Sequence, residues 1–165
     1  MIKLLSLHWI LLSFLFSFGS TDDTENNSRE EPGITSESTE TADITAVSVS
    51  GNENAYTFSV TISSPDLGCN QYADWWEVID MEGNLIYRRI LAHSHVKEQP
   101  FTRSGGQVRI SEDTEVYVRA HMNNSGYGPN AFRGSVSNGF NAFELSSDFA
   151  KSLESEQSLP NGCAF

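Results

Sequence analysis

Histidines are the residues in this 165-residue chain whose type and spacing best suit chemistry. His93 and His95 form a His-x-His pair, whose side chains share one face of an extended segment, and His121 ends a later apolar-polar alternation. Neutral imidazoles bind zinc or copper at about 2.0–2.1 Å, and a carboxylate from Asp74 or Glu98 can complete the shell. We expect histidines that bond locally or face solvent, and a three-histidine metal site is the alternative.

Motifs of common enzymes are absent from the sequence. It contains no Gly-x-Ser-x-Gly elbow, no phosphate-binding glycine loop, no His-Glu-x-x-His and no Cys-x-x-Cys. We therefore expect a protein that is not an enzyme and that has no cofactor, with zinc or copper as the alternative.

Aromatic and cationic side chains form a second candidate site. Trp75 and Trp76 are adjacent in an extended segment, so one faces the core and the other faces outward. An outward Trp beside Arg89 and Tyr127 would make a platform for a sugar or peptide, whereas the stem of Arg89 can also simply cover the ring. A one-residue register slip exchanges the two tryptophans, so the sequence leaves their orientation open. The candidate binding residues are Asp74, Trp76, Arg89, Phe101, Arg103 and Tyr127.

The elements that position these residues are strands, because apolar residues alternate with period two from Ile44 onward. We expect about seven strands, with one short helical segment near 150–153. The predicted strands are 44–50, 55–63, 74–80, 85–92, 107–111, 115–121 and 131–136. Short strands separated by turns predict an all-β fold, a single antiparallel β-sandwich.

One hairpin has a predictable register. If Glu82 and Gly83 form the loop, paired residue numbers sum to 165. The expected pairs are Glu77 with Arg88, Trp76 with Arg89, and Trp75 with Ile90, each of which is chemically favourable.

The segment 113–129, DTEVYVRAHMNNSGYGP, resembles the sixth strand and following loop of fibronectin type III domains. The resemblance is close over these 17 residues, extends to 44–136 only in layout, and implies a sandwich without implying an activity. The chain departs from the family in its long 66–74 loop, its paired tryptophans and its unusual 93–106 connection.

The type III layout implies that the three histidines and Asp74 lie at one pole of the sandwich. The strand that starts at Asp74 then shares a sheet with the strands that end at Ala92 and His121. The pole comprises loops 69–74, 93–106 and 123–130. Within it, 101–106 is either a recognition loop or a crossover between the sheets.

The N-terminal part predicts export. Residues 1–19 combine Lys3, an apolar stretch and the small-x-small pattern at 17–19, which is typical of a cleavable signal peptide, although an uncleaved anchor is the alternative. No cysteine near its end suits lipid modification. Residues 20–43 form an acidic Ser/Thr-rich linker that we expect to be disordered, 44–144 the sandwich, and 145–165 a tail.

Export favours a disulfide between the two cysteines, Cys69 and Cys163. Such a bridge ties the tail to the 66–74 loop and stabilises the fold by about 4 kcal/mol in the chain-entropy model. Two free thiols, or a thiolate ligand, are the alternatives.

The formal net charge of −12 argues against binding to nucleic acids and to anionic membranes, both of which select basic surfaces. We expect a secreted or extracytoplasmic interaction module that binds a protein or glycan at the cell surface through the loops of one pole, and that meets a membrane only through its signal peptide. A metal-binding protein and a purely structural surface protein are the alternatives.

Overall fold

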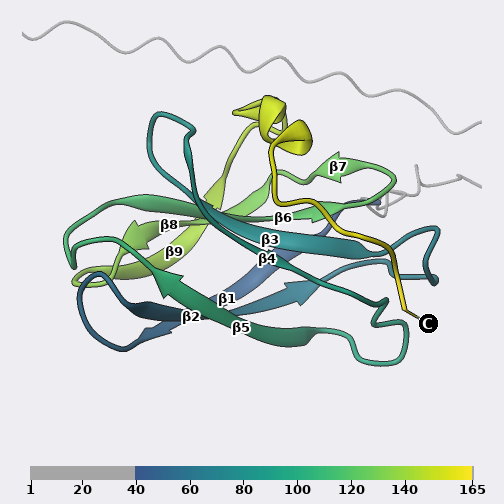
Figure 1. Cartoon of the computed structure of the whole chain (residues 1–165), viewed down its shortest axis with the longest axis horizontal. Coiled ribbons are helices and arrows are strands. Elements are labelled where there is room, and N and C mark those ends of the chain that lie inside the picture. The colour runs from purple at the N-terminus through teal and green to yellow at the C-terminus, as the bar shows by residue number, and fades with distance from the viewer. Residues whose placement is uncertain (1–39, 165) are drawn as a thin grey trace, which may run out of the picture. The chain divides into compact units, whose positions relative to one another are not determined.

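The structure, a computed structural model, describes residues 40–164; the predicted signal peptide and most of the predicted linker lie outside the described residues. Two antiparallel sheets form the domain (Figure 1), with strand orders β1-β2-β5 and β4-β3-β6-β8-β9, and β7 pairs with β6. The strands are β1 Asp43–Ser50, β2 Tyr56–Ser63, β3 Ala73–Ile79, β4 Leu85–Ile90, β5 Phe101–Val108, β6 Val116–Met122, β7 Gly126–Tyr127, β8 Asn130–Ser135 and β9 Gly139–Glu144.

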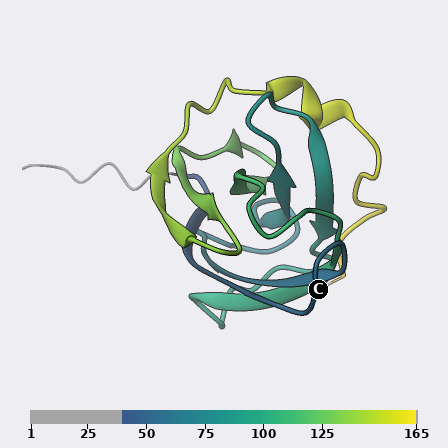
Figure 2. The same cartoon turned by 90° about the vertical axis from the view of Figure 1, so that its left-hand side faces the viewer.

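The two sheets, which Figure 2 shows in end view, enclose the main core. Its side chains come from alternate positions of the strands, as period two requires when one face of a sheet is buried. Phe58, Val60 and Ile62 of β2 face Trp76, Val78, Val116 and Val118 of the larger sheet, and each of these is fully buried. The predicted all-β antiparallel sandwich is confirmed.

The three predicted pairs of the hairpin are confirmed, but the predicted two-residue loop is wrong. A register shift after Val78 pairs Ile79 with Leu85, and the loop has three residues, 81–83. In the β3–β4 pair, Trp75 lies opposite Ile90, Trp76 opposite Arg89 and Glu77 opposite Arg88. The turn between the strands is held by Asp80, which accepts hydrogen bonds from the backbone N–H groups of Glu82 and Asn84 at 3.0 and 2.8 Å.

Two strand predictions were wrong. We expected a loop at 101–106 and a strand at 107–111, but 101–108 is β5, which pairs with β2 from Phe101 to Val108. Its alternation is hidden because the inward positions 103 and 105 are Arg and Gly; a Cβ on Gly105 would lie 2.5 Å from the hydroxyl oxygen of Tyr87. β9 was missed, although the Asn138-Gly139 dipeptide at its start is a common hairpin signal.

The C-terminal segment 145–164, here called the C-terminal strap, covers the outer face of the larger sheet (Figure 1). It contains a 3-10 helix, η1 Lys151–Ser155, close to the helical segment expected from the sequence. A second apolar cluster lies beneath the strap and contains Ile79, Tyr117, Ala131, Leu145 and Leu153.

A buried ion-pair network fastens the strap. Glu77 accepts hydrogen bonds from Arg88 on one carboxylate oxygen at 2.6 and 2.8 Å and from Arg119 on the other at 2.8 Å. These three side chains are at most 2% exposed. The guanidinium groups also donate to main-chain carbonyl oxygens of the strap, those of Phe149, Ala150, Leu153, Glu156 and Ser158. A single glutamate therefore holds both arginines in place for the strap.

The predicted disulfide between Cys69 and Cys163 is present, with Cα atoms 5.6 Å apart. It anchors the end of the strap to the loop between β2 and β3. Among residues 40–164, the structure contains no helix long and apolar enough to cross a membrane.

Candidate functional site

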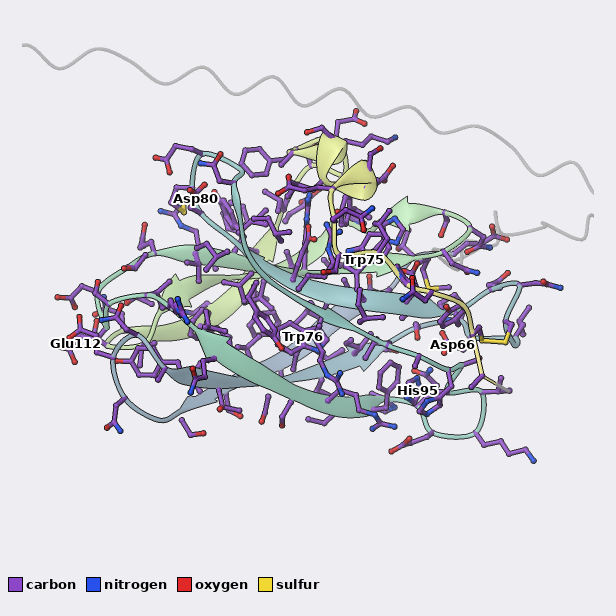
Figure 3. All side chains as sticks on the ribbon, in the orientation of Figure 1. Asp66, Trp75, Trp76, Asp80, His95 and Glu112 are labelled. Carbon is purple, nitrogen blue, oxygen red and sulfur yellow. A yellow bond between two sulfur atoms is a disulfide. The ribbon has the colours of Figure 1, made fainter. Side chains whose placement is uncertain are left out.

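The loops at one end of the sandwich are organised by a buried carboxylate, Asp66. One oxygen of Asp66 accepts hydrogen bonds from Ser64 Oγ at 2.7 Å and from the Ala73 backbone N–H at 3.0 Å. The other oxygen accepts from the His95 backbone N–H at 2.7 Å. Asp66 thus joins the 64–72 loop to the 91–100 loop, and Figure 3 shows it beside His95 at the end of the domain opposite Glu112.

The first hollow at this end, here called the loop hollow, has a volume of about 540 Å³ and a mostly apolar lining. It is formed by His93, Ser94, His95, Val96, Lys97, Glu98 and Ala164. Ala164 reaches it because its backbone N–H donates to the carbonyl oxygen of Ala92 at 2.7 Å, next to the disulfide. One wall of the loop hollow therefore depends on the position of the strap.

His95 is the unusual residue of the loop hollow. It is only 3% exposed, its ring stacks on Phe101 with centroids 3.7 Å apart, and both of its ring nitrogens lack a hydrogen-bond partner. Burial, together with the charge of Arg103 and of His93, lowers the pKa of His95, so the neutral imidazole is favoured. A buried imidazole without partners is costly unless a bound group supplies the missing hydrogen bonds.

Exposed apolar side chains gather at the same end. Within the described residues, the large hydrophobic side chains that are exposed are Leu67 at 75% and Val96 at 42%. Their loops are joined by a hydrogen bond from the Gly68 backbone N–H to Ser94 Oγ at 3.2 Å. The loop hollow is therefore accompanied by apolar surface that a partner can cover.

A second hollow, here called the strap hollow, has a volume of about 470 Å³ and contains a carboxylate–imidazole pair. Asp74 Oδ1 lies 2.7 Å from His121 Nδ1, and both side chains are less than a tenth exposed. Burial raises the pKa of Asp74, and the hydrogen bond and charge of His121 oppose that rise. The lining residues are Cys69, Tyr72, Asp74, Trp75, His121, Asn123, Glu154, Leu159, Pro160, Gly162 and Cys163.

The candidate three-histidine group does not form, although the histidines lie on loops and strand ends of the same pole. His93 and His95 have ring centroids 4.4 Å apart, whereas His121 is stacked on Trp75 in the strap hollow. Glu98 pairs with Arg103 at 2.8 Å. Within residues 40–164, no three His, Cys, Asp or Glu side chains are grouped so that they could hold a metal ion.

Most of the predicted binding residues are buried rather than surface residues. Trp76, Phe101, Tyr127 and Asp74 are 0, 1, 3 and 5% exposed, because the sandwich core and the strap cover them. No tryptophan platform forms, since both tryptophans are buried: Trp76 lies between the sheets, and Trp75 lies on the outer side of β3, beneath the strap (Figure 3).

The two remaining binding candidates are arginines outside the core. Arg89 is exposed and donates to the Ser104 carbonyl oxygen at 3.2 Å, while Arg103 is partly exposed and is paired with Glu98. Neither lines the loop hollow or the strap hollow.

Sequence reasoning missed Asp66 and Glu154. Asp66 follows Ser64-Pro65 in a segment that reads as an ordinary loop, and no local pattern shows that its partners lie up to 29 residues away. Glu154 belongs to the strap, and its position next to His121 depends on how the strap folds back.

Comparison with known proteins gives one informative relative. No family model and no solved structure matches the chain. A protein of Halomicrobium mukohataei named "Putative lipoprotein" is 42% identical over 90 residues, which cover 54% of this chain. The match spans 43% of that protein, so the chain corresponds to less than half of its length. The fibronectin type III assignment accordingly stays a prediction.

Proposed function

We propose that the protein is an exported, surface-associated and non-enzymatic module that binds a glycan or protein ligand in the loop hollow. The observation that carries the proposal is His95, a buried imidazole that lines a hollow and has no partner on either ring nitrogen. A bound ligand would cover the apolar lining of the hollow. Both ring nitrogens are buried and Nδ1 lies 3.8 Å from Asp66, so a ligand would supply their missing hydrogen bonds after a small shift of the ring.

Three further observations support this assignment. The relative is named as a lipoprotein, and lipoproteins are exported proteins. Disulfides persist in oxidising compartments, so the Cys69–Cys163 bridge also favours export. The rigidity of the site also suits recognition, because Asp66 and the disulfide fix the loops before a ligand arrives.

The ligand search has a glycan arm and a protein arm. The mature protein is applied to a glycan array, and a photo-crosslinking amino acid at position 97, on the rim of the hollow, is used on intact cells that express the protein. The same crosslinker at position 112 serves as the control at the opposite end of the domain (Figure 3).

Two variants decide whether a signal comes from the loop hollow. Val96→Asp places a charge on its apolar rim and His93→Ala removes one wall, so each should reduce binding at least tenfold. Glu112→Gln should leave binding unchanged. If all three variants bind equally, or if crosslinks form equally from positions 97 and 112, the loop hollow is not the binding site.

A further inference from the structure

The His121 ring in the strap hollow is held in one orientation by two neighbours. Trp75 stacks on it with centroids 3.6 Å apart and ring planes within 7° of parallel. Asp74 Oδ1 lies 2.7 Å from Nδ1 and fixes the orientation of the ring. In the tautomer whose Nδ1–H donates to the carboxylate, Nε2 carries the lone pair. A histidine fixed in this way is typical of metal ligands, whose second ring nitrogen almost always donates to a carboxylate or carbonyl.

Nε2 of His121 faces a second acceptor across a gap. Oε1 of Glu154, on η1 of the strap, lies 3.8 Å away, which is too far for a hydrogen bond. Both residues line the strap hollow and also an adjoining hollow of about 340 Å³, so the space around the gap is accessible from two sides. In the tautomer with the lone pair on Nε2, the two atoms are both acceptors, and a cation between them would satisfy both.

The separation of 3.8 Å suits a metal ion between the two atoms. With metal–nitrogen and metal–oxygen distances of about 2.1 Å, it corresponds to an angle of roughly 130° at the ion, and a closure of about 0.4 Å gives the tetrahedral angle. One imidazole with one carboxylate is a donor set for zinc and related divalent ions.

We propose that His121 Nε2 and the Glu154 carboxylate bind a divalent transition-metal ion of the zinc class, with Asp74 as the residue that orients His121. Water or a group from a ligand fills the remaining coordination positions, because the described residues offer no third protein ligand at this place. Lys151 lines the adjoining hollow and lies 3.7 Å from Asp148. The guanidinium groups of Arg88 and Arg119 lie over the rings of Trp75 and Tyr127, which contact His121, and both are paired with Glu77. The site lies apart from the loop hollow, so it goes beyond the function proposed above.

Such an ion would join the strap to the sheet. His121 belongs to β6 and Glu154 to the strap, which ends at the disulfide beside both hollows. Because only the folded chain brings the two ligands together, zinc should raise the midpoint of thermal unfolding.

The test uses the mature protein, stripped with EDTA and titrated with Zn²⁺ by calorimetry. We expect one ion per chain, with binding weakened at least tenfold in both His121→Gln and Glu154→Gln. Asp74→Asn, which acts only through His121, should weaken binding by about 10- to 100-fold. Glu154→Gln changes a side chain that is 30% exposed, so this variant keeps the test valid even where a buried substitution impairs folding.

Matched controls complete the design. Glu156→Gln changes an exposed carboxylate on the same strap, and the double variant His93→Ala/His95→Ala changes the imidazoles of the loop hollow; both should bind Zn²⁺ as the parent does. The proposal is overturned by the absence of stoichiometric zinc, by equal binding in Glu154→Gln and the parent, or by loss of binding in the His93/His95 variant alone.

Discussion

Replacing Glu77 by Gln tests whether the buried ion-pair network holds the strap on the sheet. The substitution keeps the size of the side chain but removes the negative charge between two arginines whose side chains are at most 2% exposed. The amide has a single oxygen acceptor, so its NH₂ group must face one of the guanidinium groups, donor against donor. Two buried positive charges then lack a counter-charge.

The expected cost follows from this geometry. Removing one partner from a buried, hydrogen-bonded ion pair typically costs about 3–5 kcal/mol, because the remaining charge stays buried without compensation. For a domain of this size, such a loss lowers the unfolding midpoint by roughly 10–20 °C. Part of the loss should appear first in the strap, whose carbonyl oxygens accept hydrogen bonds from Arg88 and Arg119.

Thermal unfolding followed by circular dichroism gives the midpoint, and hydrogen exchange of the amides in 148–158 reports the strap. The matched control is Glu115→Gln, which breaks an ion pair of the same 2.6 Å length with Arg133 on the exposed surface. The control should change the midpoint little, since solvent screens exposed pairs. A Glu77→Gln midpoint as high as that of the control, with unchanged exchange in the strap, would refute the reasoning.

Three other predictions follow from the structure. Replacing Cys69 and Cys163 together by Ser removes a bridge between residues that are 94 positions apart in the chain. The free energy of unfolding, measured with urea, should fall by about 4 kcal/mol. A urea midpoint equal to that of the parent would show that the bridge does not constrain the unfolded chain. Because the pKa of His95 is lowered in the folded chain, the unfolded chain binds a proton at this residue more readily than the folded chain does. The contribution of His95 to stability is therefore complete above about pH 6.5 and is lost as the pH falls below that value. His95→Phe should flatten this dependence by up to about 1.4 kcal/mol per pH unit in urea titrations at pH 5.5 and 7.5, and an equal slope in both proteins would assign it to another group. Gly134→Ala places a Cβ 2.0 Å from the Gly139 carbonyl oxygen and should cost about 1–3 kcal/mol in urea unfolding. Gly105→Ala should cost less, because its Cβ meets the side chains of Tyr87 and Arg89 and no backbone atom. Equal costs would show that the β8–β9 hairpin adjusts freely.

Several features could be predicted because they depend on residue types or spacings that the sequence shows directly. Alternation along β2 and β6 specifies which side chains face inward, and the complementary pairs of β3 and β4 indicate most of their register. The turn itself was not predicted, because it has three residues, 81–83, and a register shift precedes it. The even cysteine count, taken with a predicted signal peptide, pointed to the disulfide. β5 escaped prediction because Arg and Gly at its inward positions erase the apolar period.

The candidate site depended on the tertiary structure for a physical reason: whether a polar group can be buried is decided by partners that are distant in the chain. Arg88 and Glu156 meet across 68 residues, and His121 meets Asp74 across 47. The strap buries Trp75 and brings Glu154 to His121, and neither contact leaves a local pattern in the sequence. The sequence by itself determined the sandwich, three pairs of one hairpin and the cysteine pair; only the folded chain decided which histidines meet a carboxylate, which face a hollow, and which aromatic residues are covered.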